Sequence, residues 1–134
     1  MIRQWQPTDI PLVTLAMLDL KKKTIFEDSG YDTDPQEGVK WLHNVYLDHM
    51  KTVYIYEDED GQVQGICAVG LEENMFPPHV RVLSEWCMWG DSPKVMAQLW
   101  KQAKWWGKTH GALFAKRATS VEHNREVVKW EKLT

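Results

Sequence analysis

Two apolar runs separated by an acidic turn constrain the fold of this chain more than any other feature. Thr52–Glu57 and Val63–Leu71 are rich in β-branched and aromatic residues, and the acidic run Glu57–Asp60 between them is followed by Gly61. Strand-forming runs joined by a short polar turn with a glycine are typical of an antiparallel hairpin. We therefore expect a β-sheet at the centre of the molecule, covered by the helices that the rest of the chain forms.

Apolar residues at helical spacing predict two helices before the hairpin. The first is expected to open at Thr8-Asp9 and to close at Lys21-Lys22-Lys23, and the second to start at the cap Asp34 and at Pro35. A short oxygen-bearing side chain followed by proline suits a helix start, because the first N–H groups of a helix need an acceptor and proline has no N–H to leave unpaired. The apolar positions are Ile10, Val13, Met17 and Leu20 in the first helix and Val39, Leu42, Tyr46 and Met50 in the second.

Strands and helices alternate after the hairpin. The patterns predict a strand over Arg81–Trp89, a helix from about Pro93 to Lys108, a strand over Ala112–Ala118 and a short helix over Glu122–Lys132. Ile2–Trp5 is expected to be a weak first strand. The predicted order is strand, helix, helix, three strands, helix, strand, helix, which is an α/β (α+β) fold with a mixed, mostly antiparallel sheet.

Length and charge limit the class of protein. The 134 residues have room for one domain, 1–134, and the formal net charge of -3 argues against a dedicated nucleic-acid binder. No stretch approaches the ~18 apolar residues that a membrane span needs. The first residues show no basic segment leading into an apolar run, so we expect no signal peptide and a cytoplasmic location.

The cysteines and histidines do not form a metal-binding pattern. Cys67 and Cys87 both fall in predicted strands without a Cys-x-x-Cys spacing, so we expect two reduced, buried thiols and no disulfide. Five histidines also lack the spacing of metal ligands, and no metal is expected. These are His43, His49, His79, His110 and His123. The 8 tryptophans predict that the core or an interface takes up several indole rings.

The order of elements, together with three short motifs, resembles the GCN5-related N-acetyltransferase (GNAT) superfamily. Ile2-Arg3 followed by Thr8-Asp9-Ile10 is similar to the opening strand and helix cap of that family, and Ala103–Ala112 resembles its "A-x-x-x-G" exit from the third helix. Ser120–Arg125 followed by Val128–Leu133 resembles its "N-x-x-A-x-x-x-Y-E-K-L-G-F" stretch. The resemblance implies the GNAT fold through its fourth helix. The usual C-terminal strands are expected to be missing.

Phe76–Trp89, with Glu85 shortly before aromatic strand positions, is similar to small GNAT-like proteins encoded by bacteriophages. These include internal virion components. The resemblance therefore implies a location in the host cytoplasm or in the virion if a phage encodes the chain.

The family's pyrophosphate turn is altered in this sequence. In GNAT enzymes a glycine-rich turn at the start of the third helix binds the pyrophosphate of acetyl-coenzyme A through backbone N–H groups. The corresponding turn here, Gly90–Val95, has a single glycine, while Pro93 removes a donor and Asp91 adds a negative charge. Ser92, Lys94 and Val95 are the residues that could still hold pyrophosphate; the alternative is that they form an ordinary helix start.

The resemblance also assigns the reaction chemistry. Glu85 is the candidate catalytic base, because a carboxylate in apolar surroundings has a raised pKa; the alternative is a structural ion pair. The Met88 N–H would receive the thioester carbonyl, and Asn124 would contact the pantetheine arm. Trp130 stands in the fourth helix where the family has a tyrosine acid, and an indole N–H is no acid near neutral pH.

Two functions of different class follow. The first is a degenerate, non-catalytic GNAT-fold protein that acts as a structural or partner-binding component. It would bind a protein partner or a second copy through the open sheet edge beside the fifth strand and through exposed tryptophans such as Trp105. The second is an acetyl-coenzyme A-dependent N-acetyltransferase with Glu85 as base. The sequence does not indicate the acceptor amine.

Overall fold

The computed structural model describes residues 1–21, 34–73, 79–122 and 125–133. In these residues six strands form one sheet in the order β1-β2-β3-β4-β5-β6, and every neighbouring pair is antiparallel except β4 and β5. The predicted fold class, a mixed and mostly antiparallel sheet with flanking helices, is confirmed. The elements are β1 (Ile2–Gln4), a 3-10 turn (Pro7–Asp9), α1 (Ile10–Lys21), α2 (Pro35–Leu47), β2 (Lys51–Glu57), β3 (Val63–Glu73), β4 (Arg81–Gly90), α3 (Pro93–Thr109), β5 (Ala112–Glu122) and β6 (Arg125–Lys132).

The predicted hairpin is the β2–β3 pair. Its acidic tip holds its shape through Asp58, whose carboxylate accepts the backbone N–H groups of Asp60 and Gln62. Gly61 follows with a φ of 77°, which a residue with a side chain rarely adopts. The turn chemistry and the β-branched flanks therefore specify the same hairpin.

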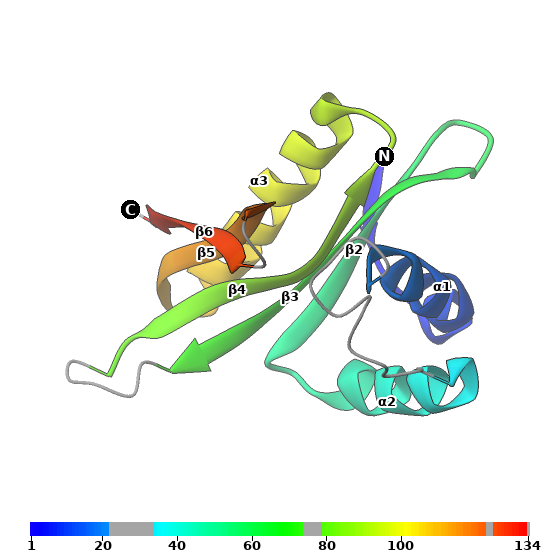
Figure 1. The fold of residues 1–134 in the computed structure, drawn as a ribbon, viewed down its shortest axis with the longest axis horizontal. Helices are drawn as coiled ribbons and strands as arrows, with labels where there is room; N and C mark the ends of the chain where they lie inside the picture. The colour runs from blue at the N-terminus through cyan, green and yellow to red at the C-terminus, as the bar shows by residue number, and fades with distance from the viewer. Residues whose placement is uncertain (22–33, 74–78, 123–124, 134) are drawn as a thin grey trace.

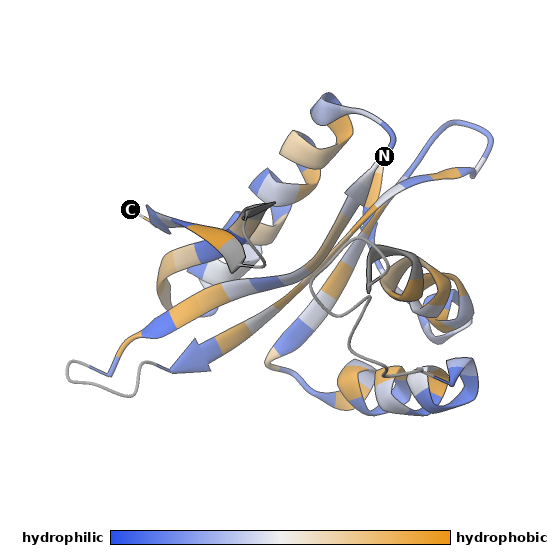
Figure 2. Cartoon of the chain, viewed as in Figure 1, coloured by the Kyte–Doolittle hydropathy of each residue, from blue (hydrophilic) through white to orange (hydrophobic). Residues whose placement is uncertain are grey.

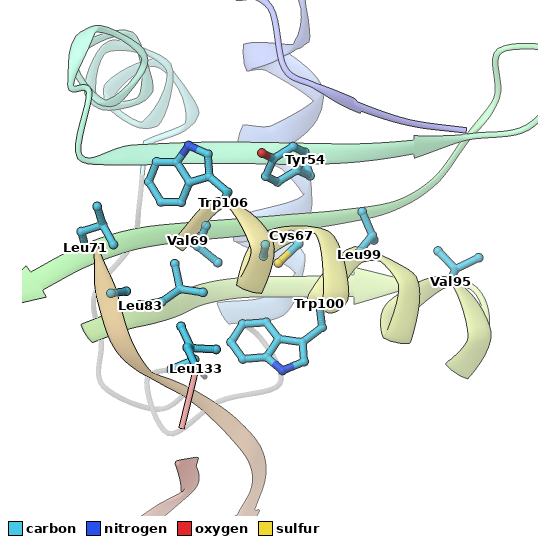
Figure 3. Close-up of a cluster of buried hydrophobic side chains, with 13 residues drawn as sticks. Tyr54, Cys67, Val69, Leu71, Leu83, Val95, Leu99, Trp100, Trp106 and Leu133 are labelled. Carbon is cyan, nitrogen blue, oxygen red and sulfur yellow. The ribbon is translucent and has the colours of Figure 1, made fainter. Parts of the chain in front are cut away.

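The helices cover opposite faces of the sheet (Figure 1): α1 and α2 lie on one face and α3 on the other. Figure 3 shows the core under α3, where Leu99 and Trp106 meet Cys67 and Val69 of β3. The second core lies under α1 and α2 and includes Ile10, Leu42, Val53 and Ile66. Figure 2 shows apolar residues along the middle of the strands and hydrophilic ones at the β2–β3 tip. The sheet is thus buried on both faces where helices cover it.

The last described segment, β6, differs from the helix predicted for it. Glu122–Lys132 was expected to be a helix, but β6 is a strand that pairs antiparallel with β5, from Phe114↔Lys132 to Glu122↔Arg125. Val127, Val128 and Trp130 favour the extended backbone, in which β-branched and aromatic side chains fit well. A fourth helix is therefore wrong, and a strand does follow β5. The open edge expected beside β5 is covered by β6, and β6 itself is now the edge of the sheet.

Contacts across the sheet end explain why β6 stays in place. The Leu133 side chain is buried in the core under α3, beside Trp100 in Figure 3. The Leu133 N–H donates to the Leu113 carbonyl at 2.8 Å. The Glu131 carboxylate accepts the Trp100 indole N–H at 3.0 Å and pairs with the Lys104 ammonium at 2.9 Å. Glu131 and Leu133 are two residues apart and both face α3, which is the side-chain alternation of a strand.

Candidate functional site

The candidate site lies where β4 and β5 separate. The two parallel strands pair from Arg81↔Ala112 to Ser84↔Lys116, and no pairing between them continues in the described residues beyond that point. Both strands run on, β4 to Gly90 and β5 to Glu122. The strands therefore diverge (Figure 1), and the region between the second half of β4 and β5 is called the β4–β5 splay below.

A β-bulge in β4 sets which residues face α3. Ala68 of β3 is opposite Cys87, whereas the next residue, Val69, is opposite Glu85, so Trp86 is the extra residue. Directly opposite residues share a face, so Glu85 faces α3 with Val69, and Cys87 faces α1 and α2 with Ala68. Glu85 and Cys87 therefore lie on opposite faces of the sheet, although they are two residues apart in one strand, because the bulge turns the strand between them.

Gly70 makes room for the bulged tryptophan. A Cβ on Gly70 would lie 2.4 Å from Cζ2 of Trp86. On its outer side the Trp86 ring lies 6.1 Å from the ring of Trp41 and carries the Lys51 ammonium 5.3 Å from its centroid. The bulge is therefore built into the packing of the α1–α2 face.

The backbone of Met88 faces the splay. The Asp91 N–H donates to the Gln64 carbonyl of the β3 side at 2.9 Å, and the β3–β4 register is regular from Gly65↔Gly90 to Ala68↔Cys87. Backbone groups alternate between the two edges of a strand. The N–H and C=O of Met88 consequently point away from β3, towards β5. The role of the Met88 N–H with a thioester carbonyl stays a prediction.

Glu85 lies half-buried beside the two cysteines. Burial raises the pKa of the Cys67 thiol well above its usual range, and the charge of Glu85 raises it further. Burial, and again Glu85, raises the pKa of Cys87 to about 12. Both cysteines are free and buried, as predicted. The raised pKa expected of Glu85 itself stays a prediction.

Arg117 of β5 is a residue of the splay that the sequence analysis missed. It follows the last β4–β5 pair, and its guanidinium lies 5.3 Å from the ring centroid of Trp100 in α3. Its Nε is buried and has no hydrogen-bond partner in the described part of the chain. The alternation of β5 was the available signal, since Ala115 and Arg117 are two residues apart and share the α3 face.

Trp100, Lys104 and Glu131 close the α3 face at β6. Trp100 is only 3% exposed, so its N–H needs an acceptor inside the protein, and Glu131 supplies it. The hydrogen bond from Trp100, followed by that from Lys104, lowers the pKa of Glu131. A carboxylate, an ammonium and an indole thus occupy the α3 face of the β5–β6 pair.

The turn before α3 is occupied by the chain's own groups. The Ser92 hydroxyl accepts the Val95 N–H at 3.2 Å, and the Ser92 carbonyl accepts the Met96 N–H at 3.2 Å. The Asp91 N–H is bonded to Gln64 as described above, and a Cβ on Gly90 would lie 2.5 Å from Cγ of Met96. Of the two alternatives for Ser92, Lys94 and Val95, these contacts match the ordinary helix start; Lys94 is exposed beside it.

Trp130 does not stand at the position expected for an acid. It lies in β6 opposite Lys116 of β5, on the face away from α3. Its side chain is 55% exposed, and the Lys116 ammonium lies 5.5 Å from its ring centroid. Its placement in a fourth helix was wrong, because that segment is a strand. Asn124 lies outside the described residues.

The described residues contain no group of three or more His, Cys, Asp or Glu side chains that could hold a metal ion. In the same part of the chain, no helix has both the length and the apolar character needed to cross a bilayer.

Comparisons with known proteins find relatives only among solved structures. No protein-family model matches the sequence, and no curated protein matches it. A tetramutant of the BH1408 protein from Bacillus halodurans has a TM-score of 0.75 at 14% identity, over 92% of this chain and 85% of that one. A predicted acetyltransferase with acetyl-CoA from Clostridium acetobutylicum has a TM-score of 0.69 at 14% identity, over 90% and 80%. A GNAT family acetyltransferase from Staphylococcus aureus has a TM-score of 0.64 at 14% identity, over 95% and 90%.

These similarities establish the fold of the chain. It has the GNAT fold, with the β4 bulge and the β4–β5 splay in place. One of the similar structures, that from Clostridium acetobutylicum, contains acetyl-CoA.

Proposed function

We propose that the chain is a non-catalytic GNAT-fold protein that acts as a structural or partner-binding component. The observation that carries this proposal is the turn before α3. In the family that turn binds pyrophosphate through free backbone N–H groups, but here the N–H groups of Asp91, Val95 and Met96 are bonded within the chain. Pro93 offers no N–H at all, and Asp91 would repel a pyrophosphate.

Strand β6 supports the same proposal. Charged and aromatic side chains of Trp100, Lys104 and Glu131 bond to one another on the α3 face of β5–β6. Opening this side to a coenzyme would leave the buried Trp100 N–H without its acceptor, which is costly in a protein interior.

Exposed apolar side chains supply a means of binding a protein partner. On α1 and α2, Leu15 is 62% exposed, Leu47 81% and Trp41 51%. Trp105 of α3, which was predicted to be exposed, is 59% exposed. Aromatic residues are enriched in the buried centres of protein interfaces. A location inside a phage particle, implied only by the resemblance of Phe76–Trp89, is part of this proposal, with the host cytoplasm as the alternative.

The second candidate function is acetyl-coenzyme A-dependent N-acetylation of an unidentified amine. The splay favours it, because the Met88 backbone points towards β5 where the two strands no longer pair, and Glu85 lies next to the β4 bulge. An N–H at that point can polarise a thioester carbonyl, and a half-buried carboxylate can take the proton of an amine. In this function Lys94 and Ser92 would still contact the pyrophosphate.

Calorimetry with acetyl-coenzyme A separates the two functions. We expect no binding heat up to millimolar ligand. Micromolar binding that Lys94→Glu abolishes would overturn the non-catalytic proposal. Lys101→Glu is the matched control, since it makes the same charge change at an exposed position further along α3.

The proposal that the chain binds a protein partner needs a separate experiment. A photo-crosslinking residue at Leu15 or Leu47 should capture one protein that the same residue at exposed Glu59 does not capture. The complex should re-form from the two purified proteins and be lost with Leu15→Lys. Equal capture at Glu59 would contradict a specific partner at these helices.

A further inference from the structure

One edge of β6 has no partner strand in the described residues, and it is called the free edge of β6 below. The strand is the last in the sheet order and pairs only with β5 in the described chain. Val128 is 44% exposed and Trp130 55%. A strand edge without a partner strand, in a strand of β-branched and aromatic residues, is a template for pairing with another strand.

The backbone phase of this edge follows from one hydrogen bond. The Leu133 N–H donates to the Leu113 carbonyl, and the β5–β6 register is regular from Phe114↔Lys132 to Ala118↔Val128. Because backbone groups alternate, the residues that point at β5 are Lys129, Glu131 and Leu133. Val128, Trp130 and Lys132 therefore present their N–H and C=O groups at the free edge.

From this edge we infer that β6 pairs antiparallel with β6 of a second copy of this chain, with the two Trp130 residues opposite each other on the two-fold axis. The phase of the edge requires that residues with outward backbone groups pair with one another. In this register Trp130 bonds to Trp130, and Val128 bonds to Lys132 on both sides of the axis. The two sheets would join into one continuous sheet, a form of strand addition.

The side chains select this register over its neighbours. With Trp130 on the axis, Lys129 lies opposite Glu131 twice, between the pairs that exchange hydrogen bonds, where side chains are closest. A shift that puts Lys129 on the axis sets two lysines face to face, which is unfavourable. A shift that puts Val128 on the axis leaves Lys129 opposite an apolar valine. On the other face the two exposed Trp130 rings become neighbours, and each Val128 meets the stem of a Lys132.

The inference goes beyond the proposed function, because the edge is available whether or not coenzyme A binds in the splay. A short edge-to-edge contact is at the small end of interfaces, so we expect a weak dimer that forms as the concentration rises. Absence of this dimer would leave the outcome of the calorimetric test of the proposed function unchanged.

Sedimentation velocity of the full chain over a concentration series tests the dimer. Lys129→Glu turns both Lys129–Glu131 pairs into like-charge pairs, and we expect it to raise the dimer dissociation constant about tenfold or more. Lys129 is exposed and lies opposite Arg117 within its own sheet, so the variant replaces a like-charge pair there with an opposite-charge pair and should fold. Lys108→Glu, at an exposed position near the end of α3, is the control with the same charge change and should leave the constant unaltered.

Disulfide trapping tests the register. In the proposed pairing the Cα atoms of opposite, hydrogen-bonded residues are about 5.5 Å apart, within the reach of a disulfide. Trp130→Cys should couple to itself, whereas Val128→Cys and Lys132→Cys should each stay monomeric alone and couple when mixed. The native thiols Cys67 and Cys87 are buried and do not compete in the folded protein.

Three results would overturn the inference. They are a monomer at all concentrations with no coupling of the Trp130→Cys variant, a dimer whose dissociation constant Lys129→Glu does not change, and self-coupling of Val128→Cys in preference to Trp130→Cys.

Discussion

Removing the Glu131 carboxylate should loosen the attachment of β6 to α3. Glu131 accepts the N–H of the buried Trp100 at 3.0 Å, and a hydrogen bond to a charged group contributes about 1.5–3 kcal/mol. The pair with Lys104 is partly exposed, with 31% and 23% of the side chains accessible, so it adds only about 0.2–1 kcal/mol. Glu131→Ala should therefore lower the free energy of unfolding by about 2–4 kcal/mol.

Urea unfolding followed by circular dichroism measures this loss. Glu131→Gln keeps an acceptor for Trp100 but loses the charge, so it should destabilise less than Glu131→Ala. Glu59→Ala removes the same side chain from the exposed β2–β3 tip and should change stability by less than about 0.5 kcal/mol. A loss for Glu131→Ala as small as that of the control would mean that Trp100 does not depend on β6 for its acceptor.

The difference in stability between the native chain and Glu131→Gln should depend on pH. The pKa of Glu131 is lowered from its ordinary 4.5, first by the Trp100 hydrogen bond and then by Lys104. A carboxyl whose pKa is lower in the folded state contributes its stability above the unfolded-state pKa and loses it as pH falls through the folded-state pKa. The gap between the native chain and Glu131→Gln should be full at pH 7 and should close at pH values below 4.5. A gap that stays constant into acid would contradict this account.

Three other residues or pairs give further predictions. Gly70→Ala should cost about 1–3 kcal/mol in urea unfolding, because its Cβ would lie 2.4 Å from the Trp86 ring; a neutral effect would mean that Trp86 is not packed there. Cys67 and Cys87 should resist a thiol reagent at pH 8 in the folded protein and react in urea, since burial raises both pKa values; rapid labelling of the native chain would contradict this. Asp9→Asn should lower stability by about 1–3 kcal/mol, as it breaks a charged hydrogen bond of 2.7 Å to the arginine of β1; the measured loss should shrink in acid, because the hydrogen bond from that arginine lowers the pKa of Asp9.

Local patterns were enough for most of the fold. The hairpin of β2 and β3 could be predicted because its acidic turn and its β-branched flanks agree. The same holds for α3, where Val95, Leu99, Ala103 and Trp106 recur at helical spacing and are all buried. In these segments local propensity and tertiary packing favour the same structure.

The segment that became β6 could not be predicted from its own residues. Its resemblance to a helical motif of the family pointed one way, and its Val-Val-Lys-Trp run pointed the other. The decision depends on tertiary contacts, above all the Trp100–Glu131 hydrogen bond and the burial of Leu133. Sequence periodicity does not contain these contacts, because they join segments about 30 residues apart.

The candidate site could be predicted only in part, because the faces of its residues also depend on contacts between distant segments. Glu85 and Met88 were placed in the correct strand, but the bulge at Trp86 that sets their faces has no sequence mark of its own. The glycine at position 70, inside a strand, was the nearest signal. Arg117 was missed because its importance comes from the divergence of β4 and β5, which only the assembled sheet shows.

The backbone amide spectrum of the protein during a coenzyme A titration tests whether the turn before α3 is closed by its own hydrogen bonds. If this turn is closed within the GNAT fold, the amide resonances of Met88, Ser92, Lys94, Val95 and Met96 do not move at millimolar coenzyme A. Saturable shifts confined to these amides would contradict a closed turn and would show that the turn still receives the pyrophosphate.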